Sequence, residues 1–202
     1  MNNIKEFFNS LNLNFDTKRL LKNEKQKIAV MCYAKNQFNE ILMLERFKEP
    51  FSGKLVPPGG KVKNNEPITD AMKREFFEET GFELNNLKLK VFTSEEGPEY
   101  YNWILFVFLA NIKLENSEKK ELKKCNEGIL KWVNVDNLLK ENLTEIDKKI
   151  IPYLYEKHGI FFIEINYDNN KKAKILNIEQ IQLLHFPYFF NTKSNRCYYQ
   201  RR

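Results

Sequence analysis

The chain has 202 residues, a length that suits one domain with terminal extensions and a buried core. Its 33 Lys and Arg residues exceed its 27 Asp and Glu residues, and the net charge of +6 favours anionic partners, nucleotides as much as nucleic acid. Its three cysteines, Cys32, Cys125 and Cys197, match the spacing of neither a disulfide framework nor a zinc site, which indicates reduced thiols.

The N-terminus has neither a continuous apolar segment nor a small-residue cleavage site, so a secretory signal is not expected. The longest apolar run, 103–110, has only the length of a strand, so no segment is expected to cross a membrane. We therefore expect a soluble, cytoplasmic protein. Residues 1–26 are interpreted as an N-terminal extension, in which four apolar residues fit a short amphipathic helix: Ile4, Phe7, Phe8 and Leu11.

Residues 27–179 are expected to form the main domain. Two β-rich runs, 27–34 and 38–46, predict a hairpin. The segment 47–60 is rich in proline and glycine, so we expect a long functional loop without regular structure. Its breaking residues are Pro50, Gly53, Pro57, Pro58, Gly59 and Gly60.

A helix is predicted to begin at Pro67, because proline is tolerated at the first helical position. Gly81 is expected to end this helix in the C-cap position. Between them, Ile68, Met72 and Phe76 recur every four residues and give an apolar stripe that should pack on a sheet.

The rest of the chain is predicted to contain further helices and strands. One or two helices are expected from Leu138 onward, extending toward His158, and the charged run at 115–126 is expected to be a solvated loop or edge. The aromatic and basic tail, 180–202, is expected to pack on the core or to be disordered, with an oligomer or polyanion contact as the alternative. Strands are predicted at 87–93, 100–112, 129–135, 160–167 and 174–178. The strand 100–112 should be central in the sheet, and the last two strands should form a hairpin.

Three glutamates on the predicted helix suggest chemistry. Glu75, Glu78 and Glu79 stand at positions i, i+3 and i+4, so their side chains share one face. They repel one another, and Arg74 can offset only part of that charge. Hard oxygen ligands suit Mg²⁺ or Mn²⁺, which can bridge phosphate oxygens and orient water. The alternative is a surface helix whose glutamates are merely solvated.

The loop before the helix offers a second feature of phosphate chemistry. Gly59 and Gly60 lack side chains, so their backbone can approach a metal or a ligand closely. Glu66 lies where a free anion would bind the helix N-terminus, so phosphates are assigned to metal and basic groups instead. Arg46 and Lys54, near the glycines, are candidate phosphate contacts.

The spacing of the whole stretch resembles the signature of the Nudix hydrolases. That signature reads here as Gly60, five residues, Glu66, seven residues, Arg74-Glu75-Phe76, one residue, Glu78-Glu79, one residue and Gly81-Phe82. Aromatic Phe76 departs mildly from it, because an aliphatic residue is commoner there. The resemblance implies an α/β fold of the Nudix α/β/α sandwich type with a mixed sheet. It also implies metal-dependent hydrolysis of a nucleoside diphosphate linked to another group.

The same resemblance implies roles for individual residues. Glu75, Glu78, Glu79 and the Gly60 carbonyl would carry Mg²⁺ or Mn²⁺, and Arg74 with Glu66 would hold the loop and helix in place. Glu75, Glu78 and Arg74 are therefore expected to be catalytic residues. The general base varies within the family, and the candidates are Glu75, Glu96, Glu127 and, as the first choice, Glu99 at the start of the 100–112 strand.

A weaker resemblance over 27–178 points to the MutT-like hydrolases of oxidised purine nucleoside triphosphates, the 8-oxo-dGTP diphosphatases. It rests on segments 127–133, 143–154 and 158–162. This chain departs from that subgroup in having Val56 before the glycines, where its mammalian member has a base-recognising Asn.

The segment that contacts the base in that subgroup usually carries a Trp and paired acids. Here it has Thr144, Ile146 and Asp147, so Asp147 alone remains to bond a purine edge. Trp132, Trp103 or Phe106 could stack on a base, although each also fits a core position.

The expected function is hydrolysis of an oxidised purine dNTP, such as 8-oxo-dGTP, to the monophosphate and pyrophosphate. A position beyond the signature gives a mixed signal, because Pro98 suggests an ADP-ribose hydrolase and Tyr100 a dinucleoside polyphosphate hydrolase. RNA decapping and a non-catalytic nucleotide sensor are more distant alternatives. The expected partner is a nucleotide, without membrane or nucleic acid, and a homodimer is left open.

Overall fold

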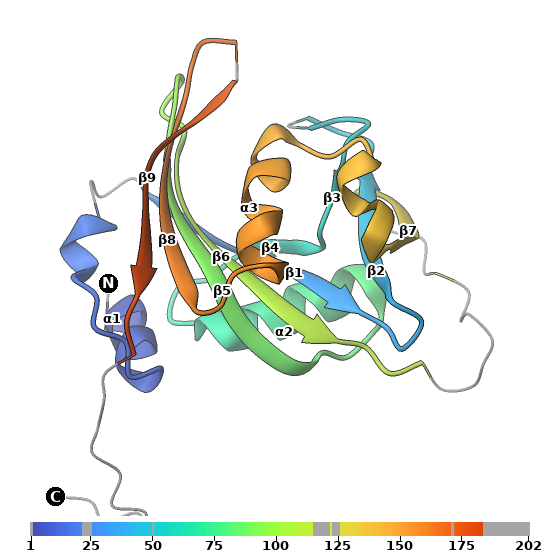
Figure 1. Ribbon diagram of the computed structural model, residues 1–202, viewed down its shortest axis with the longest axis horizontal. Coiled ribbons are helices and arrows are strands. Elements are labelled where there is room, and N and C mark those ends of the chain that lie inside the picture. The colour runs from blue at the N-terminus through green and yellow to red at the C-terminus, as the bar shows by residue number, and fades with distance from the viewer. Residues whose placement is uncertain are drawn as a thin grey trace, which may run out of the picture.

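A mixed β-sheet lies between two layers of helices (Figure 1). The computed structural model describes residues 2–21, 26–49, 51–114, 122, 126–170 and 172–183. Cys125, Cys197, most of the charged run at 115–126 and the tail beyond 183 lie outside the described residues. The arrangement confirms the α/β/α sandwich with a mixed sheet.

Within the described residues the sheet has nine strands, in the order β3-β2-β1-β6-β5-β8-β9, with β4 paired to β1 and β7 paired to β2. The pairs β1–β6 and β5–β8 are parallel, and the others are antiparallel. Strand β6 is central, as its apolar sequence predicts. The strands are β1 (Lys27–Lys35), β2 (Glu40–Arg46), β3 (Leu55–Val56), β4 (Gly59–Lys61), β5 (Asn85–Glu96), β6 (Asn102–Asn111), β7 (Gly128–Asn134), β8 (Ile160–Tyr167) and β9 (Ala173–Ile181).

The helices cover the two faces of the sheet. Helices α1 (Asn2–Ser10) and α2 (Ile68–Thr80) lie on one face, and α3 (Glu145–Tyr155) lies on the other with the 3₁₀ helix η2 (Val135–Lys140) (Figure 1). A further 3₁₀ helix, η1, spans Thr17–Arg19. In the part of the chain that the structure describes, no helix has the length and apolar character needed to cross a membrane.

Alternating side chains divide the core into two clusters. On β6, Phe106 and Phe108 pack with the helices α1 and α2, whereas Leu105 and Val107 face α3. This is the period-two alternation of a strand covered on both faces. Helix α1 belongs to the first cluster through its apolar face, since the Phe7 ring meets Phe106 edge to face at 5.4 Å. The predicted domain boundaries at 26 and 179 remain predictions.

The expectation of an irregular loop over 47–60 is wrong in part. Strands β3 and β4 form within it, and β4 pairs with Ala29–Met31 of β1. The glycines permit this pairing, because a Cβ on Gly59 would overlap the Val30 carbonyl oxygen and lie 2.7 Å from the Met31 Cα. Two glycines that looked like breakers therefore allow a close strand contact.

Other boundaries shift by a few residues. Pro67 is the N-cap of α2, with φ −61° and ψ 141°, and the helix begins one residue later than predicted. Strand β5 runs to Glu96 rather than ending at 93, so the β5–β6 turn lies over Gly97–Tyr101. The β1–β2 hairpin, the β8–β9 hairpin and the helices between Leu138 and His158 are confirmed.

Candidate active site

Helix α2 is fixed to the sheet by its apolar stripe. Ile68, Met72 and Phe76 are at most 2% exposed, and Gly81 ends the helix with a left-handed φ of 73°. Because these residues face the core, the helix directs Glu75, Glu78 and Glu79 away from its buried stripe. The predicted division of the helix into a packing face and an acidic face is confirmed.

Arg74 links the acidic face of α2 to the strand and loop before it. Its guanidinium bonds Glu66 with two hydrogen bonds, Nε to Oε1 at 2.6 Å and Nη2 to Oε2 at 2.8 Å. Nη1 donates to Glu75 at 2.7 Å and to Glu78 at 3.3 Å, and Nη2 donates to the Lys61 carbonyl at 3.2 Å. A planar guanidinium suits such multiple contacts, and a lysine cannot reproduce them.

The Arg74 contact stabilises the ionised form of Glu66. The hydrogen bond from Arg74 lowers the pKa of Glu66 from 4.5 to about 2, and the Lys63 backbone N–H at 2.9 Å also lowers it. A carboxyl whose folded pKa is depressed stabilises the fold above the unfolded pKa. This contribution is lost as the pH falls from about 4.5 to 2.

We expect Glu66→Gln to be less stable than the parent protein at pH 7, with the difference narrowing as the pH falls below 4.5. The reason is that the parent carboxylate loses its Arg74 partnership on protonation, and the glutamine has no charge to lose. Urea unfolding midpoints at pH 7, 5, 4 and 3 measure this. A stability difference that stays constant down to pH 3 would contradict the assignment.

Glu79 is bonded to the backbone of the glycine strand β4. Its Oε2 accepts a hydrogen bond from the Gly59 backbone N–H at 3.0 Å. Burial, together with the carboxylates of Glu127 and Glu75, raises the pKa of Glu79 from 4.5 to about 7, although the Gly59 bond and the charge of Arg46 oppose the rise. The surrounding protein therefore balances the negative charge of Glu79 only in part.

Gly60 is in contact with Glu75. A Cβ on Gly60 would overlap the Glu75 carboxylate, so this strand position requires glycine as long as Glu75 keeps its place. The close approach brings the β4 backbone against the acidic face of α2. Of the four residues predicted to carry metal, Gly60 and Glu75 are in direct contact and line the pocket described below, whereas Glu78 and Glu79 are not among its lining residues. Glu78 shares Arg74 with Glu75, and Glu79 bonds the neighbouring Gly59.

The chemistry of this donor set fits a hard divalent cation. All of the donors are carboxylate or carbonyl oxygens, which Mg²⁺ and Mn²⁺ prefer, and a cation would relieve the charge on Glu79. Among the described residues, no group of three or more His, Cys, Asp or Glu side chains already has an arrangement that could hold a metal ion. Glu75 and Glu78 are turned toward Arg74, and Glu79 is bonded to Gly59.

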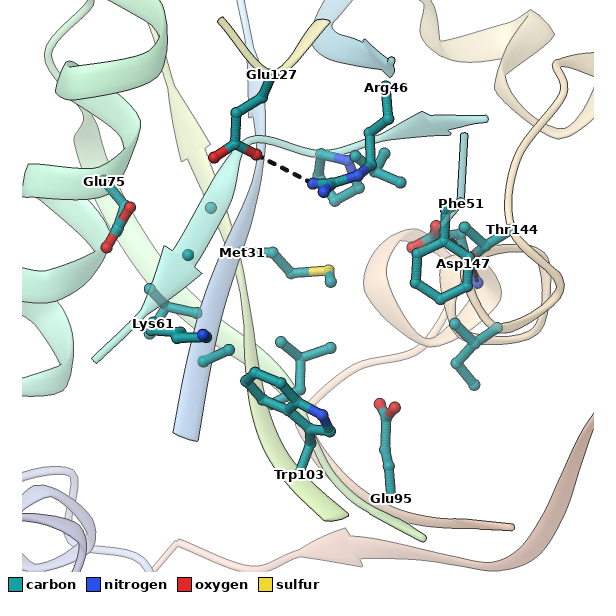
Figure 2. A pocket seen from close by; sticks show the side chains of 18 of the residues that line it. Met31, Arg46, Phe51, Lys61, Glu75, Glu95, Trp103, Glu127, Thr144 and Asp147 are labelled. Carbon is teal, nitrogen blue, oxygen red and sulfur yellow. Dashed lines mark hydrogen bonds and ion pairs between the residues drawn. The ribbon is translucent and has the colours of Figure 1, made fainter. Parts of the chain in front are cut away.

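A pocket of about 610 Å³ opens beside these residues on the α3 face of the sheet (Figure 2). Such a volume is in the range of small-molecule sites. Glu75 and Lys61 lie at one end in Figure 2, with Glu127 near them. Trp103 lies between the two ends, with its ring centroid 5.9 Å from Lys61 Nζ (Figure 2). The other end is lined by Phe51, Glu95, Tyr101, Thr144, Ile146, Asp147 and Tyr167.

Three of the five predicted substrate contacts, Arg46, Val56 and Asp147, line this pocket. Arg46 lines it and donates from Nη1 to Glu127 Oε2 at 3.2 Å, and Val56 also lines it. Lys54 is not one of the lining residues, because its Nζ bonds the Asn142 side chain at 2.7 Å. Lys61 was not predicted but lies in the pocket wall.

Trp132 does not lie in the pocket. It is a β7 residue paired with Leu42, and its ring packs against Phe82 at 5.8 Å on the α2 side of the sheet. Phe106 is fully buried on that same side. Of the three aromatic residues considered for stacking, Trp103 is the one that lines the pocket, because β6 turns its odd-numbered side chains toward α3.

Glu99, the first choice for the general base, is exposed in the β5–β6 turn with a positive φ of 57°. Neither Glu99 nor Glu96 lines the pocket, whereas Glu75 and Glu127 do. The prediction placed Glu99 at the mouth of a strand that in fact begins at Asn102, so the turn carries Glu99 away from the site.

Two buried carboxylates occupy the end of the pocket away from α2. Asp147, 2% exposed, was predicted, and it accepts hydrogen bonds from Tyr33 Oη at 2.7 Å and from Thr144 Oγ1 at 2.5 Å. Glu95 was missed, because the strand was expected to stop at 93. Extending the alternation of Val91 and Thr93 by one more step would have placed it on this face.

A sequence model of the NUDIX domain matches residues 25–154, more than half of the chain. The chain belongs to the Nudix family. As a Nudix hydrolase it is an enzyme of the nucleotide pyrophosphohydrolase class, and enzymes of this family generally use divalent metals.

Individual relatives agree with this assignment. An uncharacterized Nudix hydrolase of Bacillus subtilis, YvcI, is 26% identical over 133 residues, covering 64% of this chain and 80% of that protein. The mouse 8-oxo-dGDP phosphatase NUDT18 is 35% identical over 82 residues, which cover 41% of this chain but only 24% of that protein. Among solved structures, the mutator MutT protein of Bacillus halodurans superposes with a TM-score of 0.61 and 26% identity, covering 76% of this chain and 96% of that one.

Proposed function

We propose that this Nudix hydrolase is a magnesium-dependent pyrophosphohydrolase of nucleoside triphosphates. The proposed substrate is an oxidised purine dNTP such as 8-oxo-dGTP, and the products are the monophosphate and pyrophosphate. The observation that carries the proposal is one pocket that extends from Glu75 of α2 and the glycines of β4 to a buried, aromatic and acidic end. The two ends suit the two parts of a nucleotide, because the first could hold the charged phosphate chain and the second the flat base.

At the phosphate end, the Gly59 and Gly60 backbone and the side chains of Arg46 and Lys61 would bind the phosphate chain. Glu75, Glu78, Glu79 and the Gly60 carbonyl would hold the cation. When bound there, Mg²⁺ or Mn²⁺ supplies positive charge to the phosphate oxygens and to the leaving group. Arg74 positions Glu75 and Glu78 through its two Nη1 hydrogen bonds.

Hydrolysis breaks one bridging P–O bond between the α- and β-phosphates and adds the oxygen of water to phosphorus. A carboxylate must accept the proton of that water. Of the four candidate bases, Glu75 and Glu127 line the pocket, and we place the general base between these two. Glu127 also pairs with Arg46, so it is held close to the phosphate end.

Glu99→Gln is accordingly expected to retain turnover within about twofold of the parent enzyme, because exposed residues away from a site have small effects. Glu127→Gln should lower kcat by a larger factor, since it removes a carboxylate from the pocket wall and the partner of Arg46. Initial rates with the best substrate at saturating Mg²⁺ compare the two variants. The reverse order of effects would restore Glu99 as the base.

The base end supports a purine substrate. Asp147 accepts hydrogen bonds within the protein and still faces the pocket, and Trp103 and Phe51 provide aromatic walls. The NUDT18 relatives are described as 8-oxo-dGDP phosphatases, and the Bacillus halodurans neighbour as a mutator MutT protein. The NUDT18 description favours an oxidised guanine nucleotide for this chain as well, although the chain spans only 24% of that protein.

Hydrolysis of ADP-ribose or of a dinucleoside polyphosphate is the second candidate, from the residues Pro98 and Tyr100. Both lie in the β5–β6 turn outside the set of pocket-lining residues, and Tyr100 is 89% exposed. Their position gives this candidate less support than the pocket gives to a nucleoside triphosphate.

A substrate panel tests the proposal. It contains normal and 8-oxidised dNTPs, 8-oxo-dGDP, ADP-ribose, dinucleoside polyphosphates and capped RNA, each with Mg²⁺, and the products are identified by chromatography. The expected result is that an 8-oxo-purine dNTP has the highest kcat/KM and yields monophosphate and pyrophosphate. A preference for ADP-ribose over every triphosphate would overturn the proposal.

A further inference from the structure

Glu95 is a buried carboxylate in the pocket wall, at the end away from α2. It lies near the end of β5, pairs across the sheet with Trp103 on β6 and with Ile165 on β8, and is 2% exposed. Figure 2 shows its carboxyl group extending into the pocket beside Trp103. The reaction proposed at the phosphate end makes no use of it.

Three hydroxyl groups hold this carboxylate in place. Thr93 Oγ1 donates to Oε1 at 2.7 Å, and the hydroxyls of Tyr101 and Tyr167 donate to Oε2 at 3.0 Å and 3.2 Å. These donors come from three different strands or turns, and the rings of Tyr101 and Tyr167 pack edge to face at 5.1 Å. The orientation of Glu95 is therefore fixed before any ligand binds.

The fold itself gains little from this residue. No Lys, Arg or His in the described part of the chain forms a salt bridge with Glu95, and a buried carboxylate without a cation is costly. Burial raises the pKa of Glu95, and the nearby Asp147 carboxylate raises it further. A feature that costs stability and faces a pocket is expected at positions that serve a ligand.

The two carboxylates at this end of the pocket offer a ligand hydrogen-bond acceptors. An ionised carboxylate can accept about four hydrogen bonds; Glu95 accepts three within the protein and Asp147 accepts two, so both retain acceptor positions. A ligand group placed between these two carboxyl groups in their ionised form therefore meets acceptors, and N–H donors on the ligand would favour the ionised form against the effect of burial. It must present N–H donors.

We propose that Glu95 determines the base specificity of this enzyme by accepting hydrogen bonds from the N–H edge of a 2-amino-6-oxopurine. Such a base carries a ring N–H and an exocyclic amino group side by side, and both are donors. In this proposal the 2-amino-6-oxopurine lies against Trp103, and Asp147 is the second hydrogen-bond acceptor. The inference rests on the proposed function for the phosphate end, and it adds the residue that selects the base.

The first experiment measures binding, which does not depend on turnover. Calorimetric titration of the full chain in Mg²⁺ with dGMP and with dIMP compares two ligands that differ only in the 2-amino group. The parent protein is expected to bind dGMP about tenfold more tightly or better, because a donor lost opposite a buried acceptor leaves it unpaired. Equal affinities would overturn the proposal, even if the enzyme proves to hydrolyse triphosphates.

The second experiment uses Glu95→Met, which removes both oxygens and keeps a side chain of similar length. The dGMP to dIMP affinity ratio should fall to within about twofold of unity. With triphosphates, KM for dGTP and 8-oxo-dGTP should rise while kcat changes little, because the phosphate end is untouched. An unchanged ratio in a folded Glu95→Met protein would overturn the role of Glu95.

The matched control is Glu164→Met, on the neighbouring strand β8, where Glu164 accepts a bond from Asn177 and lies outside the pocket lining. It should leave the ratio unchanged. If Glu95→Met does not fold, Glu95→Gln takes its place and should lower the ratio about threefold, because it removes the charge from the hydrogen bond. If no triphosphate is hydrolysed but dGMP is still preferred through Glu95, the proposed reaction fails and the base assignment stands.

Discussion

Glu79→Gln is expected to lower kcat about a thousandfold, because a lost metal ligand removes several kcal/mol of transition-state stabilisation. Glu78→Gln should have an effect of similar size. The fold should survive, since the glutamine oxygen can still accept the Gly59 N–H bond that Glu79 accepts. Initial rates with the best substrate of the panel, in saturating Mg²⁺, measure the effect.

Stability provides the control for this prediction. In the absence of metal, the pKa of Glu79 in the folded protein is raised from 4.5 to about 7, so ionisation of Glu79 reduces stability as the pH rises through this window. Glu79→Gln should therefore be at least as stable as the parent at pH 8, and this advantage should vanish below pH 4.5. Loss of activity accompanied by loss of stability at pH 8 would indicate a structural role, and undiminished turnover would contradict the metal assignment.

The neighbouring glycines should respond differently to the same substitution. Gly59→Ala should destabilise the protein by about 2 to 3 kcal/mol, because the new Cβ meets the backbone of β1 at Val30 and Met31, which cannot move aside cheaply. Gly60→Ala should cost about 1 kcal/mol or less, since its Cβ meets the flexible end of Glu75. It should nevertheless lower kcat about a hundredfold by displacing that carboxylate.

Urea unfolding and steady-state kinetics on the two alanine variants separate these effects, and Gly53→Ala shows the cost of a positive φ of 73° with no neighbour near the Cβ. If Gly60→Ala keeps full activity, Glu75 does not need its observed place for catalysis. If Gly59→Ala is as stable as the parent, the close packing of β4 on β1 is not required.

The sequence predicts the acidic helix well because its information is local. The apolar stripe at Ile68, Met72 and Phe76, the cap at Gly81 and the spacing of the glutamates all lie within one stretch of chain. Such a pattern fixes both faces of the helix without knowledge of its neighbours. The fold then follows from the resemblance that the same stretch carries.

The pocket could not be predicted in the same way, because its lining comes from strands far apart in the sequence. Trp132 and Trp103 look alike as aromatic residues within strands, but β7 directs the first toward α2 and β6 directs the second toward α3. Glu95 and Glu99 are only four residues apart, and a difference in the end of β5 decides which of them is buried. Strand ends are the least certain part of a sequence-based prediction, and here they determine the site.

The prediction of an irregular loop at 47–60 is wrong in part because it uses only neighbours along the chain. Proline and glycine indicate a break in regular structure when judged by their neighbours along the chain. At Gly59 and Gly60 the decisive neighbours are Val30 and Glu75, on another strand and on the helix. Only the three-dimensional arrangement shows that these glycines form a strand.

Cation binding tests most directly the claim that the carboxylates of α2 hold the metal on which the reaction depends. Titration of Mn²⁺, followed by electron paramagnetic resonance of the free ion, compares the parent protein with the Glu78→Gln/Glu79→Gln double variant, both folded and without nucleotide. We predict that the parent binds Mn²⁺ and that the double variant binds it about tenfold more weakly or worse. Equal Mn²⁺ affinity in the two proteins would contradict the account.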